Sequence, residues 1–474
     1  MKKMIFMMAL LLAMGTAQGK VRLPHLLSDG MILQQQSDAH LWGWAKPGAM
    51  VQATISTTGI TTTAKADPKG NFKLSVKTPA ASYAPFSIML NDGDGEVSIN
   101  NVLSGEVWVC AGQSNMEMPM AGFWNCPVEG YNEEVVNARQ YPGIHYVKIP
   151  SVMSMTPLGD THCKWETISP HTVGDCSAAG YFFAQVVNRA LDVPVGLILA
   201  NKGGTRVESW LDYDNLKRHT TESLDSMENV KKFNWDFHRP LVWGNVTFHP
   251  ILNYSIKGIL FYQGCSNVGD PGDKYSTNLK LLVEQWRRGF NQGEVPFYFV
   301  QIAPYENNDV NGDWGPKLRE QQFKASEIIP NSAIVCTEDL VYPYETKQIH
   351  PAQKRQVGQR LAYLALNRDY GMKEMRCYSP AFKEMSISND TCYVTIQNDY
   401  QALNRSEGLE GFEVAGADKV FHKACASFGP RGIAVTSPEV KQPVAVRYCF
   451  RNFQLGNVSN AAGLPLFPFR TDDW

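Results

Sequence analysis

The chain has 474 residues, of which 44% are hydrophobic and 11% aromatic, whereas Asp, Glu, Lys and Arg together make up only 19%. This composition excludes an intrinsically disordered chain, and the length predicts about three domains, because a domain typically holds roughly 150 residues. The formal net charge of -2, from 44 basic against 46 acidic residues, gives no sign of the basic excess that is typical of nucleic-acid-binding proteins, so we expect no nucleic-acid partner.

Residues 1–19 have the composition of a signal peptide. Two lysines precede an apolar run at 5–14, and small residues follow up to Gly19, as a signal peptidase requires. This run is too short to span a bilayer, and no later stretch approaches the roughly 18 uninterrupted apolar residues that a transmembrane helix needs. We therefore expect an exported protein, periplasmic or secreted, with no membrane partner after cleavage.

Residues 20–101 predict an N-terminal β-sandwich module. Short stretches of alternating apolar residues are separated by turn-forming residues such as Asp-Pro-Lys-Gly at 67–70, and no helical pattern interrupts them. The predicted strands are 41–44, 51–55, 72–76, 87–90 and 97–99.

Residues 102–373 alternate apolar strands with helical stretches, which predicts a mostly parallel sheet covered by helices. Residues 374–474 return to short strands and predict a C-terminal β-rich module. In the middle part we expect strands at 107–111, 195–200, 256–262, 295–303 and 333–336, and helices at 181–191, 275–288, 317–328 and 352–367. In the last part we expect strands at 393–396, 412–415, 433–435 and 444–448.

Ten cysteines in an exported chain permit disulfides. We expect Cys110, Cys265 and Cys336 to be free thiols, because they lie in or just after apolar strand-like runs. Disulfides of open connectivity are expected instead within 126–176 and 392–449. Neither a CxxC spacing nor an HExxH motif occurs, so we expect neither a metal nor another cofactor.

Ligands of an open α/β sheet bind outside the carboxyl ends of its strands. Three predicted strand ends carry glycine beside hydroxyl or amide side chains: GQSNM at 112–116, NKGGT at 201–205 and QGCSN at 263–267. Acyl transfer needs a nucleophile, a base and donors for the oxyanion. Ser114, His350, the amide of Gly204 and the side chain of Asn267 could fill these roles.

The segments GQSNM, NKGGTRVESW, FYQGCSN and IHPAQKRQVGQRLA, in this order, resemble the sialate O-acetylesterase family of SGNH hydrolases. LLSDGMILQ near the start and AGLPLFPFRTDDW at the end are also similar to that family. The resemblance implies a flavodoxin-like α/β three-layer sandwich with flanking β modules, which removes O-acetyl groups from sugars without a metal. It implies Ser114 as nucleophile, His350 as base, and Gly204 and Asn267 as oxyanion contributors beside the Ser114 backbone N–H.

The sequence departs from the family in the acid that orients the histidine. SGNH hydrolases commonly place Asp three residues before the His, where this chain has Lys347, and related acetylxylan esterases carry Glu where this chain has Cys265. Asp339 is our candidate for this acid, although a turn or capping role would explain it equally well. Glu345 and a backbone carbonyl, which would leave a Ser-His dyad, are the alternatives.

Other residues are expected near the substrate. Gln113, Gln263 and Arg206 are candidate substrate-binding residues, although a salt bridge would also explain Arg206. Glu117 could lie near the pocket or could only face the dipole of its helix. Aromatic side chains in loops near the predicted strand ends are candidates for the rim of the site: Trp124, Trp314, Tyr342 and Tyr344.

These observations predict a serine carbohydrate esterase whose partner is an O-acetylated sugar. Sialic acid is the sugar that the resemblance names, and an acetylesterase for xylan or another plant polysaccharide is the alternative. A non-catalytic carbohydrate-binding protein is a third hypothesis, motivated by the missing acid. The sequence leaves the oligomeric state open.

Overall fold

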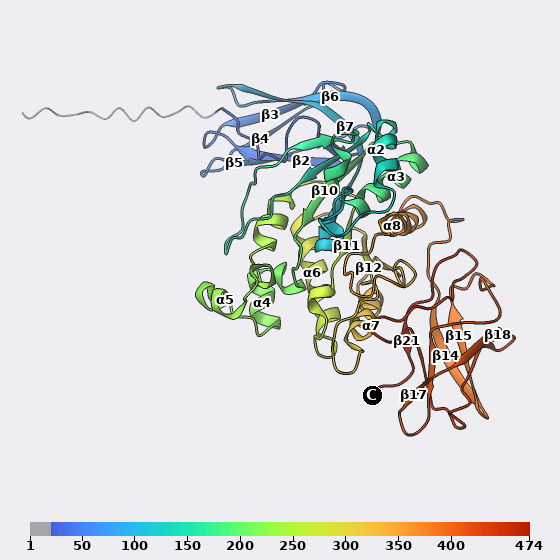
Figure 1. The fold of residues 1–474 in the computed structure, drawn as a ribbon. Helices are drawn as coiled ribbons and strands as arrows, with labels where there is room; N and C mark the ends of the chain where they lie inside the picture. The colour runs from blue at the N-terminus through green and yellow to red at the C-terminus, as the bar shows by residue number, and fades with distance from the viewer. Residues whose placement is uncertain (1–19) are drawn as a thin grey trace, which may run out of the picture.

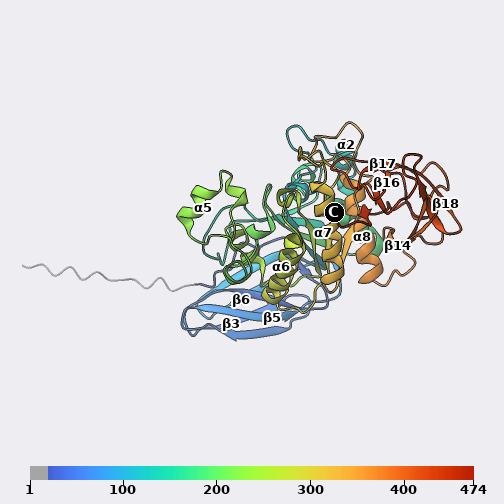
Figure 2. The same ribbon diagram turned by 90° about the horizontal axis from the view of Figure 1, so that it is seen from below.

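The computed structural model describes residues 20–474, so the predicted signal peptide lies outside the described residues. The fold is mixed α/β, with one large sheet covered by helices and smaller antiparallel sheets. Figures 1 and 2 show the N-terminal strands, in blue, and the C-terminal strands, in red, at separate ends of the helical part. None of the described helices is long and apolar enough to cross a membrane.

The N-terminal part consists mainly of strands, as predicted, and these pair antiparallel except for β1 (Ile32–Gln34), which pairs parallel with β7 (Glu96–Gly112). In β5 (Asn71–Lys77) buried and exposed residues alternate along the whole strand, which is the pattern of a sheet with one face on the core. β2 (Asp38–Trp44) pairs with β5, and β3 (Met50–Ile55) pairs with β4 (Thr61–Lys65) and β6 (Ser82–Asn91). β1 and β4 were not predicted.

A single strand, β7, joins this part to the central sheet. We expected two strands, at 97–99 and 107–111, and this expectation was wrong. Asn101 has a left-handed φ of 55° and lies at a register shift between β6 and β7, so the strand passes through a bulge without ending. The predicted domain boundary after residue 101 therefore falls inside β7.

The central sheet has the order β13-β12-β11-β7-β10-β8-β9. All its neighbours are parallel except β9, which pairs antiparallel with β8 at the edge. All the strands predicted here are present, whereas β8 and β9 were missed. The strands other than β7 are β8 (Ile144–Lys148), β9 (Trp165–Thr167), β10 (Val195–Asn201), β11 (Gly258–Tyr262), β12 (Phe297–Val300) and β13 (Ser332–Val335).

Four long helices cover the two faces of this sheet, and all four were predicted. Alternate residues of β7 point to opposite faces of the sheet. Val109 belongs to the hydrophobic cluster that includes residues of α6 (Lys274–Phe290) and α7 (Trp314–Ile328). Trp108 belongs to the cluster that includes residues of α3 (Ala178–Leu191) and α8 (Lys354–Arg368). The shorter helices are α1 (Ser114–Glu117), α2 (Tyr131–Asn137), α4 (Tyr213–His219) and α5 (Ser226–Lys232).

The C-terminal part contains two four-stranded antiparallel sheets, of order β14-β15-β19-β18 and β17-β16-β20-β21. Apolar side chains from both sheets form one hydrophobic cluster. The strands are β14 (Ala381–Ser388), β15 (Thr391–Gln397), β16 (Phe412–Ala415), β17 (Phe421–Lys423), β18 (Cys425–Gly429), β19 (Gly432–Thr436), β20 (Ala445–Tyr448) and β21 (Phe469–Arg470).

All ten cysteines fall within the described residues and are free thiols. The expectation for Cys110, Cys265 and Cys336 is thus confirmed, and the disulfides expected elsewhere are not formed. In the C-terminal part, Cys425 is exposed whereas Cys392 is buried.

Candidate active site

The residues that follow β7, β10 and β11 meet at one edge of the sheet, as predicted. The strands are neighbours, and backbone hydrogen bonds continue past their ends: Lys202 N donates to Gly112 O at 3.0 Å, and Gln113 N donates to Tyr262 O at 3.0 Å. The three glycine-containing segments are therefore brought together at the carboxyl ends of parallel strands, where α/β proteins bind ligands.

Ser114 is the first residue of α1 and is half-buried. Its backbone N–H lies in the first turn of the helix, where amides have no intrahelical acceptor. Gln113 holds the segment in place: its Oε1 accepts from Gly264 N at 2.8 Å, and its Nε2 lies 3.5 Å from Ser266 Oγ. The side chain of Gln113 is buried, so it supports the serine loop rather than facing solvent.

The two glycines after β10 approach the serine closely. A Cβ on Gly203 would lie 3.4 Å from Ser114 Cβ, and Gly203 N donates to Glu117 Oε2 at 2.6 Å. Gly204 has a left-handed φ of 76°, which favours glycine. No hydrogen bond within residues 20–474 uses the Gly204 N–H. Beside Ser114, this amide is therefore a free donor of the kind that an oxyanion requires.

Asn267 lies near these loops, but its amide is fully engaged. Nδ2 donates to Glu208 Oε2 at 3.0 Å and to Asp270 Oδ2 at 2.9 Å, while Oδ1 accepts from Val207 N and Gln263 Nε2. The structure thus leaves Asn267 no free donor for an oxyanion, because the two carboxylates take both of its N–H groups. Its visible role is to join the loops that follow β10 and β11.

His350 lies in the loop before α8. Its Nε2 is buried and has no hydrogen-bond partner among the described residues, and the ring of Phe123 packs edge-on at 5.1 Å. Burial, together with the nearby ammonium group of Lys354, lowers the pKa of His350 to about 4. The imidazole is therefore neutral near pH 7, which is the state that a general base needs.

The structure does not bring Asp339 to His350, contrary to our expectation for the acid. Both Asp339 oxygens accept hydrogen bonds from Arg360, at 2.7 and 2.6 Å, because the guanidinium of α8 reaches this carboxylate. The alternative, Glu345, accepts from the backbone N–H groups of Tyr342 and Ala352 at 2.8 and 3.1 Å. Both acidic candidates are thus engaged elsewhere.

Gln263 and Arg206, which we expected at the substrate, are also engaged in the protein. Gln263 Nε2 donates to Thr205 O at 2.9 Å, and the side chain is buried. Arg206 donates to Glu222 Oε1 at 2.7 Å and to His238 O at 3.0 Å. Like Gln113, they act as supports between loops in this structure, and their expected substrate contacts stay a prediction.

A buried link between the serine and histidine loops was not predicted. Asn115 Nδ2 donates to Ile349 O at 2.9 Å, and Lys354 Nζ donates to Asn115 Oδ1 at 2.8 Å and to Pro351 O at 2.7 Å. Asn115, next to Ser114, is thereby bound directly to Ile349 and through Lys354 to Pro351, the two neighbours of His350. The sequence signal was present in GQSNM and in the lysine four residues after the histidine, but the pairing depends on tertiary structure.

The sequence model of a family described as carbohydrate esterase, sialic acid-specific acetylesterase, matches residues 104–367. The chain belongs to this family. It is 26% identical over 402 residues to the sialate O-acetylesterase of Homo sapiens, covering 77% of this chain and 74% of that protein. It is 24% identical over 453 residues to the sialate O-acetylesterase of Mus musculus, and this match covers 83% of this chain and 82% of that protein.

A crystal structure of a carbohydrate acetylesterase from Xanthomonas citri is similar over nearly the whole length. The TM-score is 0.85 at 30% sequence identity, and the match covers 96% of this chain and 100% of that chain. This carbohydrate esterase is therefore a carboxylic ester hydrolase, as predicted.

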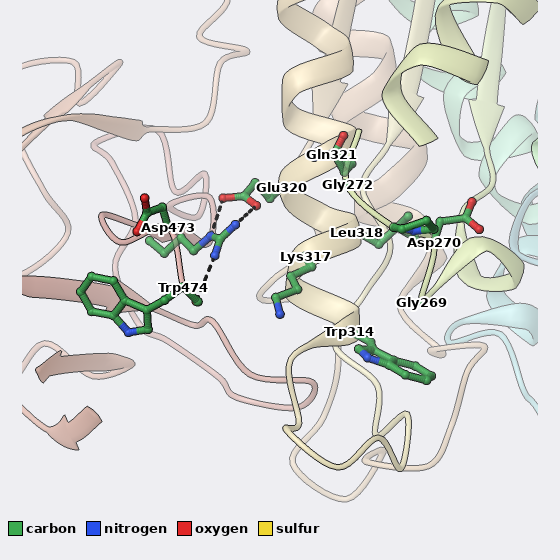
Figure 3. Close-up of a pocket in the computed structure, with 12 residues that line it drawn as sticks. Gly269, Asp270, Gly272, Trp314, Lys317, Leu318, Glu320, Gln321, Asp473 and Trp474 are labelled. Atoms are coloured by element: carbon green, nitrogen blue, oxygen red, sulfur yellow. Dashed lines mark hydrogen bonds and ion pairs between the residues drawn. The ribbon is translucent and has the colours of Figure 1, made fainter. Parts of the chain in front are cut away.

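Trp124 and Tyr344 are exposed on loops and Tyr342 is half-buried, whereas Trp314 is exposed at the first residue of α7 and not in a loop as we expected. Their place at the rim of the site stays a prediction. Trp314 lines a hollow of about 420 Å³ and packs beside Gly269, on the loop that follows Asn267 (Figure 3). Lys317 of α7 reaches into the same hollow, whose other wall is the chain end at Asp473 and Trp474.

Proposed function

We propose that the chain is a serine carbohydrate esterase that removes O-acetyl groups from sugars through an acetyl-enzyme on Ser114. One observation carries this proposal. Ser114 lies against Gly203, whose neighbour Gly204 has a free backbone N–H. Asn115 and Lys354 bind the loop that carries the neutral His350. A hydroxyl, a free donor and an unprotonated imidazole are the parts that acyl transfer requires.

In the proposed mechanism, His350 Nε2 takes the proton of Ser114 Oγ as the oxygen attacks the acetyl carbonyl carbon. The oxyanion accepts hydrogen bonds from the backbone N–H groups of Ser114 and Gly204. Collapse of the tetrahedral intermediate transfers the proton from His350 to the departing sugar hydroxyl. Water then hydrolyses the acetyl-enzyme by the same steps, with His350 as the base.

We propose sialic acid as the acetylated sugar. The family description and the names of the human and mouse relatives support this choice. The alternative is a polysaccharide acetylesterase, since the Xanthomonas citri enzyme is named only as acting on carbohydrate. Acetate release from O-acetylated sialic acid but not from acetylated xylan supports the first choice, and the reverse supports the second.

We also propose that the α/β part is a flavodoxin-like SGNH hydrolase domain and that the flanking parts are β-sandwich modules. Support comes from the helices on both faces of the parallel sheet and from the apolar cluster shared by the two C-terminal sheets. For residues 1–19 we propose a cleaved signal peptide and export to the periplasm or beyond. N-terminal sequencing of the mature protein tests this, and an unprocessed Met1 contradicts it.

The central test compares wild type with Ser114→Ala and His350→Ala on 4-nitrophenyl acetate and O-acetylated sialic acid. Both variants should lose roughly a thousandfold or more in turnover. Ser388→Ala, at an exposed serine of β14, is the matched control and should retain full activity. Full activity of Ser114→Ala on both esters contradicts the proposed nucleophile. Sugar binding without acetate release by the wild-type protein would instead support the non-catalytic sugar-binding alternative.

A further inference from the structure

The Nδ1 side of His350 contacts a cysteine rather than a carboxylate. Cys126 Sγ lies 3.5 Å from His350 Nδ1, and Cys126 comes from the loop before α2, 224 residues away in sequence. A thioether or thiol sulfur is a weak acceptor, and a thiol is also a weak donor. The direction of the thiol proton therefore decides what this contact does to the imidazole.

Two amide oxygens determine that direction. Cys126 Sγ lies 3.1 Å from Gln348 Oε1 and 3.2 Å from Asn125 Oδ1, so the S–H donates to one of these acceptors. Gln348 is itself oriented, because its Nε2 donates to Asn125 O at 3.2 Å and its Oε1 also accepts from His350 N at 3.3 Å. With its proton directed at an amide oxygen, the sulfur presents a lone pair to His350.

We propose that Cys126 is the positioning residue of His350: its sulfur accepts from Nδ1–H and thereby keeps the lone pair of Nε2 free for the Ser114 proton. This role rests on the proposed function, and it deepens that function by naming the group that stands in the place of the missing acid. A neutral imidazole has one N–H and one lone pair, so fixing Nδ1–H fixes the tautomer.

The surroundings of the pair agree with this assignment. Burial raises the pKa of Cys126, so the thiol keeps its proton near pH 7 and can donate to Gln348. The ring of Phe123 packs edge-on against the imidazole of His350. The second ring nitrogen of His350, Nε2, is buried and has no partner among the described residues. The ionisable groups around the pair are Lys354 of α8 and Glu345, whose oxygens accept from backbone amides; Cys265 lies near Lys354.

The test measures kcat, KM and the pH profile on 4-nitrophenyl acetate for Cys126→Ala, Cys126→Ser and Cys126→Asp. Cys126→Ala should lose about tenfold to a hundredfold in kcat at little change in KM, which is less than the roughly hundredfold to ten-thousandfold that a general base contributes, because His350 itself is still present. Cys126→Ser restores an acceptor and should recover most of that loss. Cys126→Asp places a carboxylate beside Nδ1 and should move the acid limb of the profile upward by at least one pH unit.

Controls separate this role from simple packing. Cys392→Ala removes another buried thiol, on β15 in the C-terminal part, and should leave kcat and the profile unchanged. Circular dichroism checks that each variant is folded. Wild-type kcat in Cys126→Ala, or an unmoved acid limb in Cys126→Asp, overturns the positioning role. If Ser114→Ala also retains activity, the proposed function itself fails, whereas an inactive Ser114→Ala confines the failure to Cys126.

Discussion

Replacing Asp339 by Asn tests whether this carboxylate serves the fold or the chemistry. Both oxygens accept from Arg360, at 2.7 and 2.6 Å, and the guanidinium also donates to Cys336 O at 2.8 Å. Asn keeps one acceptor and directs an NH₂ group at the other guanidinium donor. Hydrogen bonds to charged groups contribute about 1.5–3 kcal/mol, and exposure reduces this, so we expect a loss of about 1–2 kcal/mol of stability.

Turnover should change much less than stability. Neither Asp339 oxygen contacts His350, so kcat of Asp339→Asn on 4-nitrophenyl acetate should stay within about threefold of wild type, whereas loss of a triad acid costs about ten-thousandfold. Urea unfolding and initial rates on the same samples measure both effects. A hundredfold fall in kcat with an unchanged urea midpoint would refute the assignment of Asp339 to Arg360 and return it to the histidine.

Because burial and Lys354 lower the pKa of His350 to about 4, kcat/KM should hold as pH falls from 7 and decline only near pH 4; an acid limb near 6.5 contradicts this. His350 has a pKa of 6.5 in the unfolded chain and about 4 in the folded protein, so between these values the unfolded state binds the proton more readily. Stability, measured as the urea midpoint, should therefore decrease as pH falls from 6.5 through 4. Gly204→Ala should lower kcat at least tenfold, since its Cβ would lie 2.4 Å from the ring of Phe237; unchanged kinetics of a folded variant would show that the loop adapts. Arg319→Met should cost about 2–4 kcal/mol in urea unfolding, because the fully buried guanidinium donates to Arg451 O at 2.7 Å and to other buried acceptors; a loss under 1 kcal/mol contradicts this.

The elements of the fold were predictable wherever the pattern was local. The helix expected at 275–288 is α6 (Lys274–Phe290), because its apolar residues recur at helical spacing and face the sheet. The division of β7 failed for a physical reason: Asn100 and Asn101 are typical of a turn, but the left-handed Asn101 forms a bulge, and pairing with β1 and β6 continues the strand.

The site was predictable only in part, because adjacency in sequence reveals strand ends but not side-chain partners. Ser114 and Gly204 follow strands directly, so topology alone brings them to one edge of the sheet. The partners of Asp339 and Asn267 depend on Arg360 and Glu208, which tertiary structure brings in from other segments. Cys126 illustrates the same limit, since its loop reaches His350 only in the folded chain.

Buried amides connect the loops of the site before any substrate is present. Gln113 joins the serine loop to Gly264, Gln263 reaches Thr205, and Asn267 reaches Val207, so each side chain links segments that follow different strands. Such bonds hold the proposed oxyanion donor, Gly204, and the proposed nucleophile, Ser114, in place before the reaction begins. Donors that need no reorganisation during the reaction are the main source of electrostatic catalysis. The aromatic side chains of Trp124 and Tyr344, by contrast, lie exposed on loops, and that of Trp314 lies exposed at the start of α7, where a substitution costs the core little. We therefore expect ester hydrolysis and the choice of sugar to depend on different parts of the molecule, so that a substitution of an exposed aromatic residue changes the preference among acetylated sugars and leaves turnover of 4-nitrophenyl acetate unchanged.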